Sequence, residues 1–443
     1  MFQNQLIPAS IYVNAGRVAA VTSFENIPPD CEILEAGEDS IVMPGLVDSH
    51  VHVNEPGRTE WEGFATATRA AAAGGVTTIV DMPLNCIPAT TTVDALKAKL
   101  TAARGKLMVD SAFWGGVVPG NTAELAKLWD AGVVGFKCFL VHSGVDEFPN
   151  VTESDLRTAM PELARLGAML IVHAEVPGPI DSACCQAPGD AADRSYETFL
   201  HSRPRAAENE AIELMIRLSR DTGCRIHIVH HSSADALAAL RAAKAAGAQL
   251  TVETCPHYLH FAAEDIPDGA TEFKCCPPIR ERANREQLWE ALRDGTIDMV
   301  VSDHSPCPPE MKVREQGDFM RAWGGISSLQ LRLPLMWTEA SARGFTIDQL
   351  AEWLCAAPAR QVGLAPVKGS ISVGGDADIV IWNPEREFLV APGLIQHRHK
   401  LTPYAGETLR GVVEKTFLRG QMVYDGGEFG EPKGQLLFRA RSG

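Results

Sequence analysis

The sequence predicts an α/β protein, a (β/α)8 TIM barrel with a small β-sandwich domain formed by both chain ends. From Gly45 to about Pro366, short β-branched apolar runs alternate with longer stretches rich in Ala, Leu, Arg and Glu. This alternation is typical of βα units that build a parallel sheet. Eight such units can be counted, which is the number that the barrel requires.

The eight expected strands are short and apolar, and a helical stretch follows most of them. Helices are expected from about Trp61, Asn121, Ala206 and Ala234, and several end in glycine, which favours a left-handed helix cap. The expected strands are Leu46 to His52, Val76 to Asp81, Met108 to Trp114, Val133 to Phe139, Met169 to His173, Arg225 to His230, Gln249 to Glu253 and Asp298 to Ser302.

The two ends of the chain have a different pattern from the middle. Residues 1–44 contain short alternating strands around an Asn14-Ala15-Gly16 turn, and the segments that begin at Lys368 and Leu409 read as strands joined by glycine-rich turns. We therefore expect residues 1–44 and 368–443 to form one small β domain beside a catalytic barrel domain of residues 45–367.

The composition and net charge of the chain limit the kinds of molecule that the protein is expected to bind. The chain has 443 residues, of which 45% are hydrophobic and 22% are charged, so it can bury a substantial core. Its net charge of −16 argues against nucleic acid or an anionic membrane and favours a small molecule. No apolar run is long enough to span a bilayer, and the first residues lack a signal-peptide pattern, so a cytoplasmic location is expected. The eleven cysteines include no C-x-x-C pair and read as reduced thiols.

A His-x-His pair is the strongest chemical signal. Side chains alternate between the faces of a strand, so His50 and His52 project to the same side. Taken alone, such a pair is more often structural than metal-binding.

Other metal-compatible side chains fall at the ends of expected strands. Lys137 lies near the end of one strand, His173 and His230 end two others, and Asp303 follows a fourth. Barrel active sites lie at the carboxyl-terminal mouth of the strands. These side chains are therefore expected to meet His50 and His52 there.

Lys137 needs a chemical change before it can join such a site. A protonated ammonium has no acceptor and repels cations. A neutral amine held in an apolar strand can take up CO2 to form a carbamate, an anionic group with two oxygens that can bridge two cations. Without the histidines around it, Lys137 would read as a snorkelling or ion-paired lysine.

The remaining histidines are less clear. Strand alternation allows only one of His230 and His231 to face the barrel interior, and spacing alone leaves the choice open. His257 and His260 are minor ligand candidates. Four histidines without a converging partner are expected to be solvated: His142, His201, His397 and His399.

These motifs resemble the amidohydrolase superfamily, in its cyclic amidohydrolase branch of dihydroorotases, hydantoinases and allantoinases. The resemblance covers essentially the whole chain. The segments are most similar to allantoinases in HVHVNEPGRTEWEGF, in DMPLN from Asp81, in KCFL from Lys137, in ETCPHYL from Glu253, in KCCPPIR from Lys274 and in SDHSPC from Ser302.

The resemblance implies a binuclear hydrolase that opens the hydantoin ring of allantoin to allantoate through a hydroxide bridging the metals, in purine catabolism. It implies that His50, His52 and Asp303 bind one metal, that His173 and His230 bind the other, and that N6-carboxylated Lys137 bridges them. Asp303 is expected to act as general base and then acid. The ligand set suits two Zn2+ ions and tolerates Mn2+, Co2+ or Fe2+. Relatives are commonly oligomers, so a homotetramer is expected.

The choice of substrate rests on fewer residues. Dihydroorotases of this type carry an arginine where this chain has Asn54, so an anionic ring would lose its partner, although Arg58 lies four positions further on. Asn54 and Asn85 suit a neutral ureide, which needs both donors and acceptors. By similarity to hydantoinases, the backbone at Cys276 is expected to bind the ring amide.

Three other functions stay open at this point. A hydantoinase or dihydropyrimidinase, or a dihydroorotase, is the first alternative. A non-enzymatic scaffold is disfavoured because every ligand position is filled. A two-metal phosphotriesterase shares the ligand pattern but lacks the TEWEGF and CPPIR segments.

Overall fold

The computed structural model describes residues 6–24, 31–184 and 193–439. The outermost parts of the expected β domain, residues 1–5 and 440–443, lie outside this range.

A closed ring of parallel strands forms the centre of the molecule. One sheet runs in the order β4-β5-β6 and a second in the order β7-β8-β9-β10-β11-β12. Only Trp114 lies between β6 and β7, so the two sheets meet there. The other two sheet edges are β4 and β12, and a parallel bridge between Val51 on β4 and His304, which follows β12, joins them. The ring therefore has eight strand positions, as expected. The strands are β4 (Leu46–Val51), β5 (Val76–Asp81), β6 (Asp110–Phe113), β7 (Gly115–Gly116), β8 (Phe136–Phe139), β9 (Met169–His173), β10 (Arg225–Ile228), β11 (Leu250–Thr254) and β12 (Met299–Val300).

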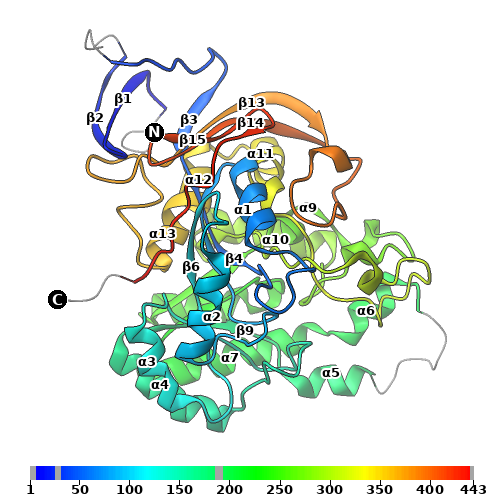
Figure 1. Ribbon diagram of the computed structural model, residues 1–443. Coiled ribbons are helices and arrows are strands. Elements are labelled where there is room, and N and C mark those ends of the chain that lie inside the picture. Colours follow the sequence, from blue (N-terminus) through cyan, green and yellow to red (C-terminus); the bar gives the residue numbers. More distant parts are fainter. Residues whose placement is uncertain (1–5, 25–30, 185–192, 440–443) are drawn as a thin grey trace.

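Helices surround this ring (Figure 1). The helix expected from Trp61 begins only at Phe64, because Gly63 has φ 104°, outside the helical region. Helix α4 starts at a capping box made by Thr152 and Asp155 and ends at Gly167 in the left-handed region. The helices are α1 (Phe64–Ala73), α2 (Val93–Ala103), α3 (Thr122–Asp130), α4 (Glu153–Leu166), α5 (Pro177–Cys184), α6 (Tyr196–Ser202), α7 (Arg205–Thr222), α8 (Leu237–Ala245), α9 (Pro256–His260), α10 (Arg282–Arg293), α11 (Arg332–Ala342), α12 (Ile347–Ala351) and α13 (Ala357–Gln361).

The two ends of the chain share a five-stranded sheet at one end of the molecule (Figure 1). Its order is β16-β15-β14-β13-β3, and β3 pairs antiparallel with β13 from Ile41↔Trp382 to Pro44↔Ile379. A hairpin of β1 and β2 forms a second sheet. The barrel with a sandwich built from both ends confirms the expected fold class. The strands are β1 (Ala9–Asn14), β2 (Arg17–Ser23), β3 (Ile41–Pro44), β13 (Ile379–Leu389), β14 (Thr408–Leu418), β15 (Gln421–Asp425) and β16 (Glu428–Phe429).

A buried ion cluster fastens the carboxyl-terminal part to the barrel. The Lys368 ammonium lies 2.5 Å from Asp110 on β6, 2.9 Å from Asp376 and 2.7 Å from Asp378. Arg419 adds a second cation against Asp110. The three carboxylates are close enough together to hold a metal ion, but Lys368 already supplies their positive charge.

The last described segment returns to the barrel. Gly434 donates to the carbonyl of Leu107, and Leu437 donates to the carbonyl of Ser111 on β6. Residues 434–439 therefore lie against the barrel and not on the five-stranded sheet.

None of the helices in the described residues is both long and apolar enough to cross a membrane. Nine cysteines have described side chains, all of them free thiols, and seven of the nine are buried, whereas Cys31 is exposed and Cys276 is partly exposed.

His260, the last residue of α9, links the barrel to the chain that enters β14. Its Nδ1 lies 2.8 Å from Glu339 on α11, and its Nε2 lies 2.5 Å from Glu407. Burial alone would lower the pKa of His260, but the hydrogen bonds to the two carboxylates outweigh it and raise the pKa to about 9.

We expect this pair of contacts to make stability depend on pH. The folded pKa exceeds the ordinary value of 6.5, so the stabilisation is complete below pH 6.5 and is lost as the pH rises through about 9. It amounts to about 3 kcal/mol at most. The Tm of the native protein should exceed that of His260→Gln at pH 6, and the gap should shrink by pH 10. His201→Gln, at an exposed histidine, is the control. A gap that stays constant with pH would contradict the expectation.

Candidate metal centre

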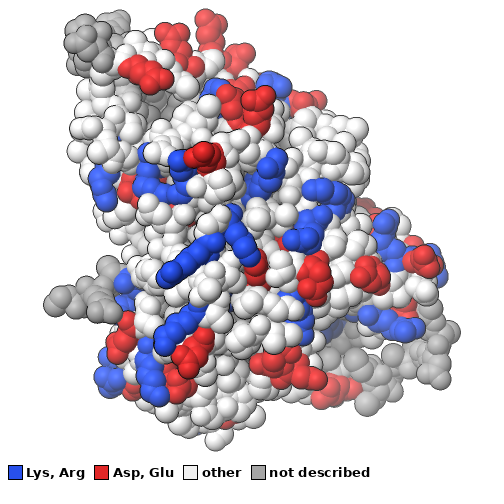
Figure 2. Space-filling view, in the orientation of Figure 1, with Lys and Arg blue, Asp and Glu red and all other residues white. Residues whose placement is uncertain are grey.

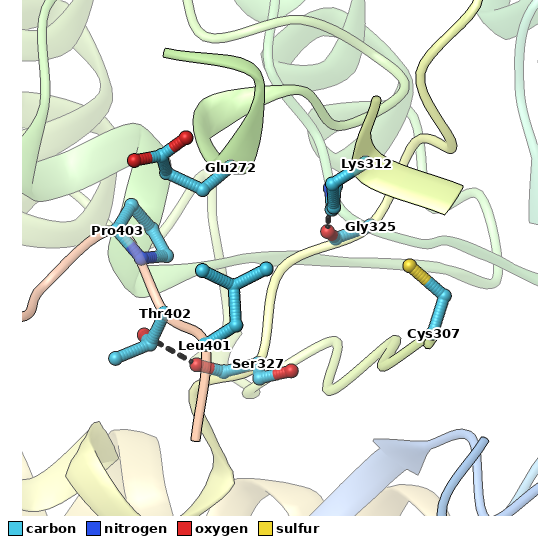
Figure 3. Close-up of a pocket in the computed structure, with 8 residues that line it drawn as sticks. All are labelled: Glu272, Cys307, Lys312, Gly325, Ser327, Leu401, Thr402 and Pro403. Carbon is cyan, nitrogen blue, oxygen red and sulfur yellow. Dashed lines mark hydrogen bonds between the residues drawn. The ribbon is translucent and has the colours of Figure 1, made fainter. Parts of the chain in front are cut away.

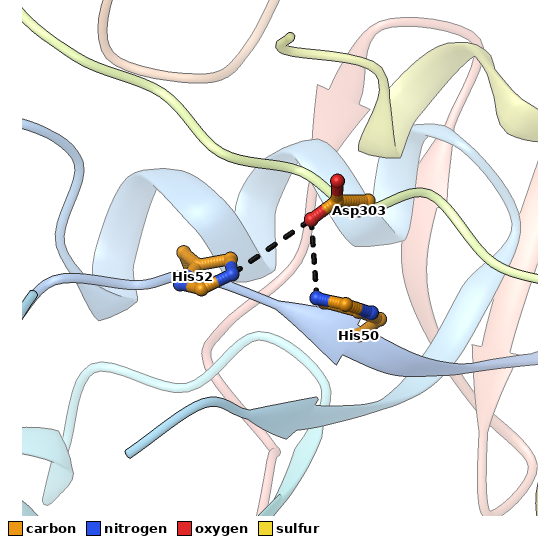
Figure 4. A group of neighbouring side chains, drawn as sticks. All are labelled: His50, His52 and Asp303. Carbon is orange, nitrogen blue, oxygen red and sulfur yellow. Dashed lines mark ion pairs between the residues drawn. The ribbon is translucent and has the colours of Figure 1, made fainter. Parts of the chain in front are cut away.

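The end of β4 and the segment after β12 bring three polar side chains together (Figure 4). Nε2 of His50 lies 3.1 Å from Oδ1 of Asp303, and Nε2 of His52 lies 3.7 Å from the same oxygen. His50 is 0%, His52 5% and Asp303 6% exposed. Two imidazoles and one carboxylate thus converge on one buried point.

Backbone strain marks this region. Four candidate site residues have positive φ although none is glycine: Asn54 (66°), Asn85 (64°), His230 (38°) and Asp303 (44°). Non-glycine residues rarely adopt this conformation, and those that do gather at functional sites. The sequence predicts that this strand extends to His230, but β10 ends at Ile228. The positive φ of His230 explains the difference, because a residue in this conformation leaves the strand ladder.

Lys137 on β8 points into the same cluster. Its Nζ lies 3.1 Å from Nε2 of His50, and the residue is 1% exposed. Burial lowers the pKa of Lys137 to about 8, although the charges of Asp303 and Glu253 oppose this shift. A larger share of the amine is therefore neutral near pH 7 than for an ordinary lysine.

His173 and His230 form the other half of the cluster. Nδ1 of His173 lies 2.9 Å from Nε2 of His230, and the ring centroids of His50 and His230 are 5.4 Å apart. His231 points elsewhere, since its Nδ1 lies 3.0 Å from Glu208. The structure thus brings all six expected ligand residues together and places His230, not its neighbour, among them.

In three of these histidines, a ring nitrogen contacts a side chain from outside the six expected ligands. Nδ1 of His50 lies 2.5 Å from Oε1 of Glu253, and Nε2 of His173 lies 2.8 Å from Oε2 of Glu175. The Asn85 amide lies 3.4 Å from Nδ1 of His52. A histidine that binds a metal usually has its other nitrogen held in this way, which fixes its tautomer.

Two of these supporting carboxylates were not assigned from the sequence. Glu253 lies inside the ETCPHYL segment, and no motif in the sequence assigns a role to Glu175. Glu175 lies two residues after His173, so strand alternation could have placed both on one face. No local signal connects Glu253 to His50, which is 203 positions away.

The charges of the cluster are mutually balanced. Burial alone would raise the pKa of Asp303, but the charge of His50 and the hydrogen bond from its ring hold this pKa well below its usual value. For His52 and His230, burial lowers the pKa well below its ordinary range. The carboxylate is thus ionised and these two rings are neutral, which are the forms that bind a cation.

The donor set fits a pair of divalent cations. Nδ1 of His230 has no hydrogen-bond partner among the described residues although it is buried. Neutral imidazole nitrogens that face one another, beside a carboxylate, leave lone pairs that a metal ion would satisfy. Imidazole and carboxylate are typical ligands of Zn2+.

The residues expected to contact the substrate differ in the contacts that they already make within the protein. The Asn54 amide donates to the carbonyl of Pro306 at 3.3 Å, and its Oδ1 has no partner among the described residues. Arg58 is engaged by Glu147 and by the carbonyl of Asn85, so its charge is already paired. Cys276 packs against Gly324, and its contact with a substrate stays a prediction.

A small pocket adjoins Cys307, four residues after Asp303 (Figure 3). Lys312 donates to the carbonyl of Gly325 on its wall, and Thr402 donates to the carbonyl of Ser327 at 2.8 Å. The segment around Thr402 thus packs against the loop that follows the last barrel strand.

One histidine expectation was wrong. His397 was expected to be solvated, but it is 1% exposed and its ring centroid lies 5.3 Å from that of His304. Its neighbours come from a distant part of the chain, which the sequence pattern did not reveal. His142 and His201 are exposed and His399 is partly exposed.

Comparison with known proteins fits this geometry. The sequence profile of the amidohydrolase family matches residues 41–423. The chain belongs to the amidohydrolase family. This amidohydrolase is 52% identical to an allantoinase of Streptomyces avermitilis over 98% of this chain and 95% of the relative. It is 47% identical to an allantoinase of Saccharomyces cerevisiae over 95% of this chain and 89% of the relative. Both confirm the resemblance inferred from the motifs.

Solved structures agree on the fold of the amidohydrolase. The L-hydantoinase of Arthrobacter aurescens matches with a TM-score of 0.90 and 33% identity, over 97% of this chain and 96% of that one. A D-hydantoinase structure matches with a TM-score of 0.88 and 27% identity, over 98% and 95% of the two chains.

Proposed function

We propose that this amidohydrolase is an allantoinase, which hydrolyses the hydantoin ring of allantoin to give allantoate. The observation that carries the proposal is the 52% identity with an allantoinase along almost the whole chain. Relatives from yeast and from Arabidopsis thaliana with the same name support it. The chain is accordingly a hydrolase that acts on a carbon–nitrogen bond in a cyclic amide.

We propose that His50, His52, His173, His230, Asp303 and N6-carboxylated Lys137 hold two divalent metal ions, of which Zn2+ fits the ligands best. When bound, such ions lower the pKa of a shared water and polarise the amide carbonyl. The imidazoles of His50 and His173 stay directed at the centre because Glu253 and Glu175 hold their opposite nitrogens.

Asp303 is the residue assigned to proton transfer. Its carboxylate accepts the proton of the attacking water and then donates it to the ring nitrogen that leaves. Asn54, Asn85 and the backbone at Cys276 are proposed to bind the ureide. The buried Oδ1 atoms of Asn54 and Asn85 lack partners among the described residues, which supports acceptor roles toward ring N–H groups.

The net charge of −16 supports a small-molecule partner. Both basic and acidic side chains lie on the face shown in Figure 2. We further propose a homotetramer, a cytoplasmic location, and a division into a barrel domain of residues 45–367 and a β domain of residues 1–44 and 368–443.

A substrate panel tests the function. Protein reconstituted with Zn2+, Mn2+ or Co2+ in bicarbonate is incubated with allantoin, hydantoin, dihydrouracil and dihydroorotate, and ring loss is followed. We expect kcat/KM for allantoin to exceed that for each other ring by at least about 10²-fold, since unpaired polar groups in the site penalise the wrong ring. Hydantoinase is the second candidate, supported by the 33% identical L-hydantoinase structure. Preference for hydantoin or dihydrouracil would replace the proposal with it.

A further inference from the structure

His257 is a buried histidine beside the centre to which no step above gives a role. It is 0% exposed and follows Pro256, the first residue of α9. Because α9 begins directly after β11, the start of this helix places the His257 ring at the mouth of the barrel. One of its ring nitrogens, the Cys255 sulfur and an Asp303 carboxylate oxygen all lie within 4.8 Å of one another.

The His257 ring lacks the partners that a buried imidazole normally has. Neither ring nitrogen makes a hydrogen bond within the described parts of the chain. A buried donor without a partner loses its hydrogen bonds to water and gains none in exchange, so such a group calls for a partner in the working protein. The nearby Cys255 is a poor partner, since burial raises the pKa of its thiol and keeps it protonated.

The two carboxylate oxygens of Asp303 differ in the contacts that they make. His50, His52 and the Ser305 hydroxyl, at 2.9 Å, all contact Oδ1. No hydrogen bond from the described residues reaches Oδ2. This is the oxygen that must stay aligned for proton transfer if Oδ1 is engaged by the centre.

We propose that His257 is a positioning residue for Asp303, whose ring N–H donates to the Asp303 carboxylate directly or through one water. The inference rests on the proposed function, since it adds to the role of Asp303 in that reaction. An imidazole always carries at least one N–H donor, so the contact gives the buried ring a partner on Asp303. Fixing the carboxylate orientation lowers the cost of reaching the reactive geometry.

Two substitutions at His257 separate positioning from packing. His257→Phe keeps a ring of similar size but removes the donor, and we expect kcat to fall about 10- to 100-fold with KM changed less than about twofold. His257→Gln retains a donor and should recover kcat to within about fivefold of the native value. Metal content, measured by mass spectrometry, should equal that of the native protein in both variants.

His397→Phe is the matched control. It replaces another buried imidazole whose ring nitrogens lack partners within the described residues, but its nearest ring belongs to His304. Its kcat should stay within about twofold of the native value. If His257→Phe does not fold, His257→Leu makes the same comparison.

Three results would overturn the inference. Native kcat in His257→Phe removes the role, and equal losses in the Phe and Gln variants indicate packing alone. A lower metal content would make His257 a metal ligand. If the native protein opens no allantoin at all, the proposed function fails before any variant is compared.

Discussion

Lys137→Ala is expected to lower kcat/KM for allantoin by at least about 10³-fold and to reduce the bound metal from two ions per chain to one or none. In the proposed centre this lysine is the one side chain that would contribute a ligand to both cations. Its Nζ lies 3.1 Å from Nε2 of His50, so truncation removes a donor from the middle of the cluster. Several kcal/mol of transition-state stabilisation depend on that arrangement.

Chemical rescue makes the Lys137 test specific. The truncated side chain leaves a buried cavity, and a short carboxylic acid such as propionate has two oxygens to replace those of the carbamate. Activity of Lys137→Ala should therefore rise with propionate, whereas Lys137→Gln, which fills the space, should not respond. Lys127→Ala, at an exposed lysine paired with Glu124, is the control. Undiminished turnover in Lys137→Ala would remove the lysine from the mechanism.

Asp303→Asn is expected to lower kcat by about 10³- to 10⁴-fold while the protein keeps its fold. A carboxamide is uncharged and accepts no proton at neutral pH, so the transfer to the leaving nitrogen is lost. The measurement is kcat at saturating allantoin together with metal content.

A buried aspartate elsewhere provides the control for Asp303. Asp318 is 5% exposed and accepts from the backbone N–H groups of Met320 and Arg321, which an asparagine oxygen can also do. Asp318→Asn should keep native kcat. Turnover in Asp303→Asn equal to that of this control would contradict the acid–base assignment.

The fold could be predicted because its signals are local. Strand runs, glycine-ended helices and the turn-rich chain ends each fall within a few residues, and the alternation along β4 is enough to place His50 and His52 on one face. Strand ends were less predictable. The strand expected from Met108 to Trp114 is observed only from Asp110 to Phe113, and the sequence did not predict β7, which follows Trp114. The indole N–H of Trp114 donates to the carbonyl of Ser49 on β4. Such a contact has no signature in the sequence around Trp114.

Interactions between distant segments account for what the sequence did not reveal in the site. The support of His50 by Glu253 and the burial of His397 beside His304 both join residues far apart in the chain. Positive φ at His230 and Asp303 is likewise imposed by the surrounding structure, since neither residue type favours it as glycine does.

The pairing of β3 with β13 has a consequence for synthesis. During translation, Ile41 leaves the ribosome long before its partner Trp382 exists, and residues 434–439, which contact β6, are made later still. Until then the nascent protein exposes unpaired strand edges, which are prone to aggregate. Chains truncated before Trp382 are therefore expected to be recovered as insoluble material, so the growing chain needs protection until residues 434–439 have been made.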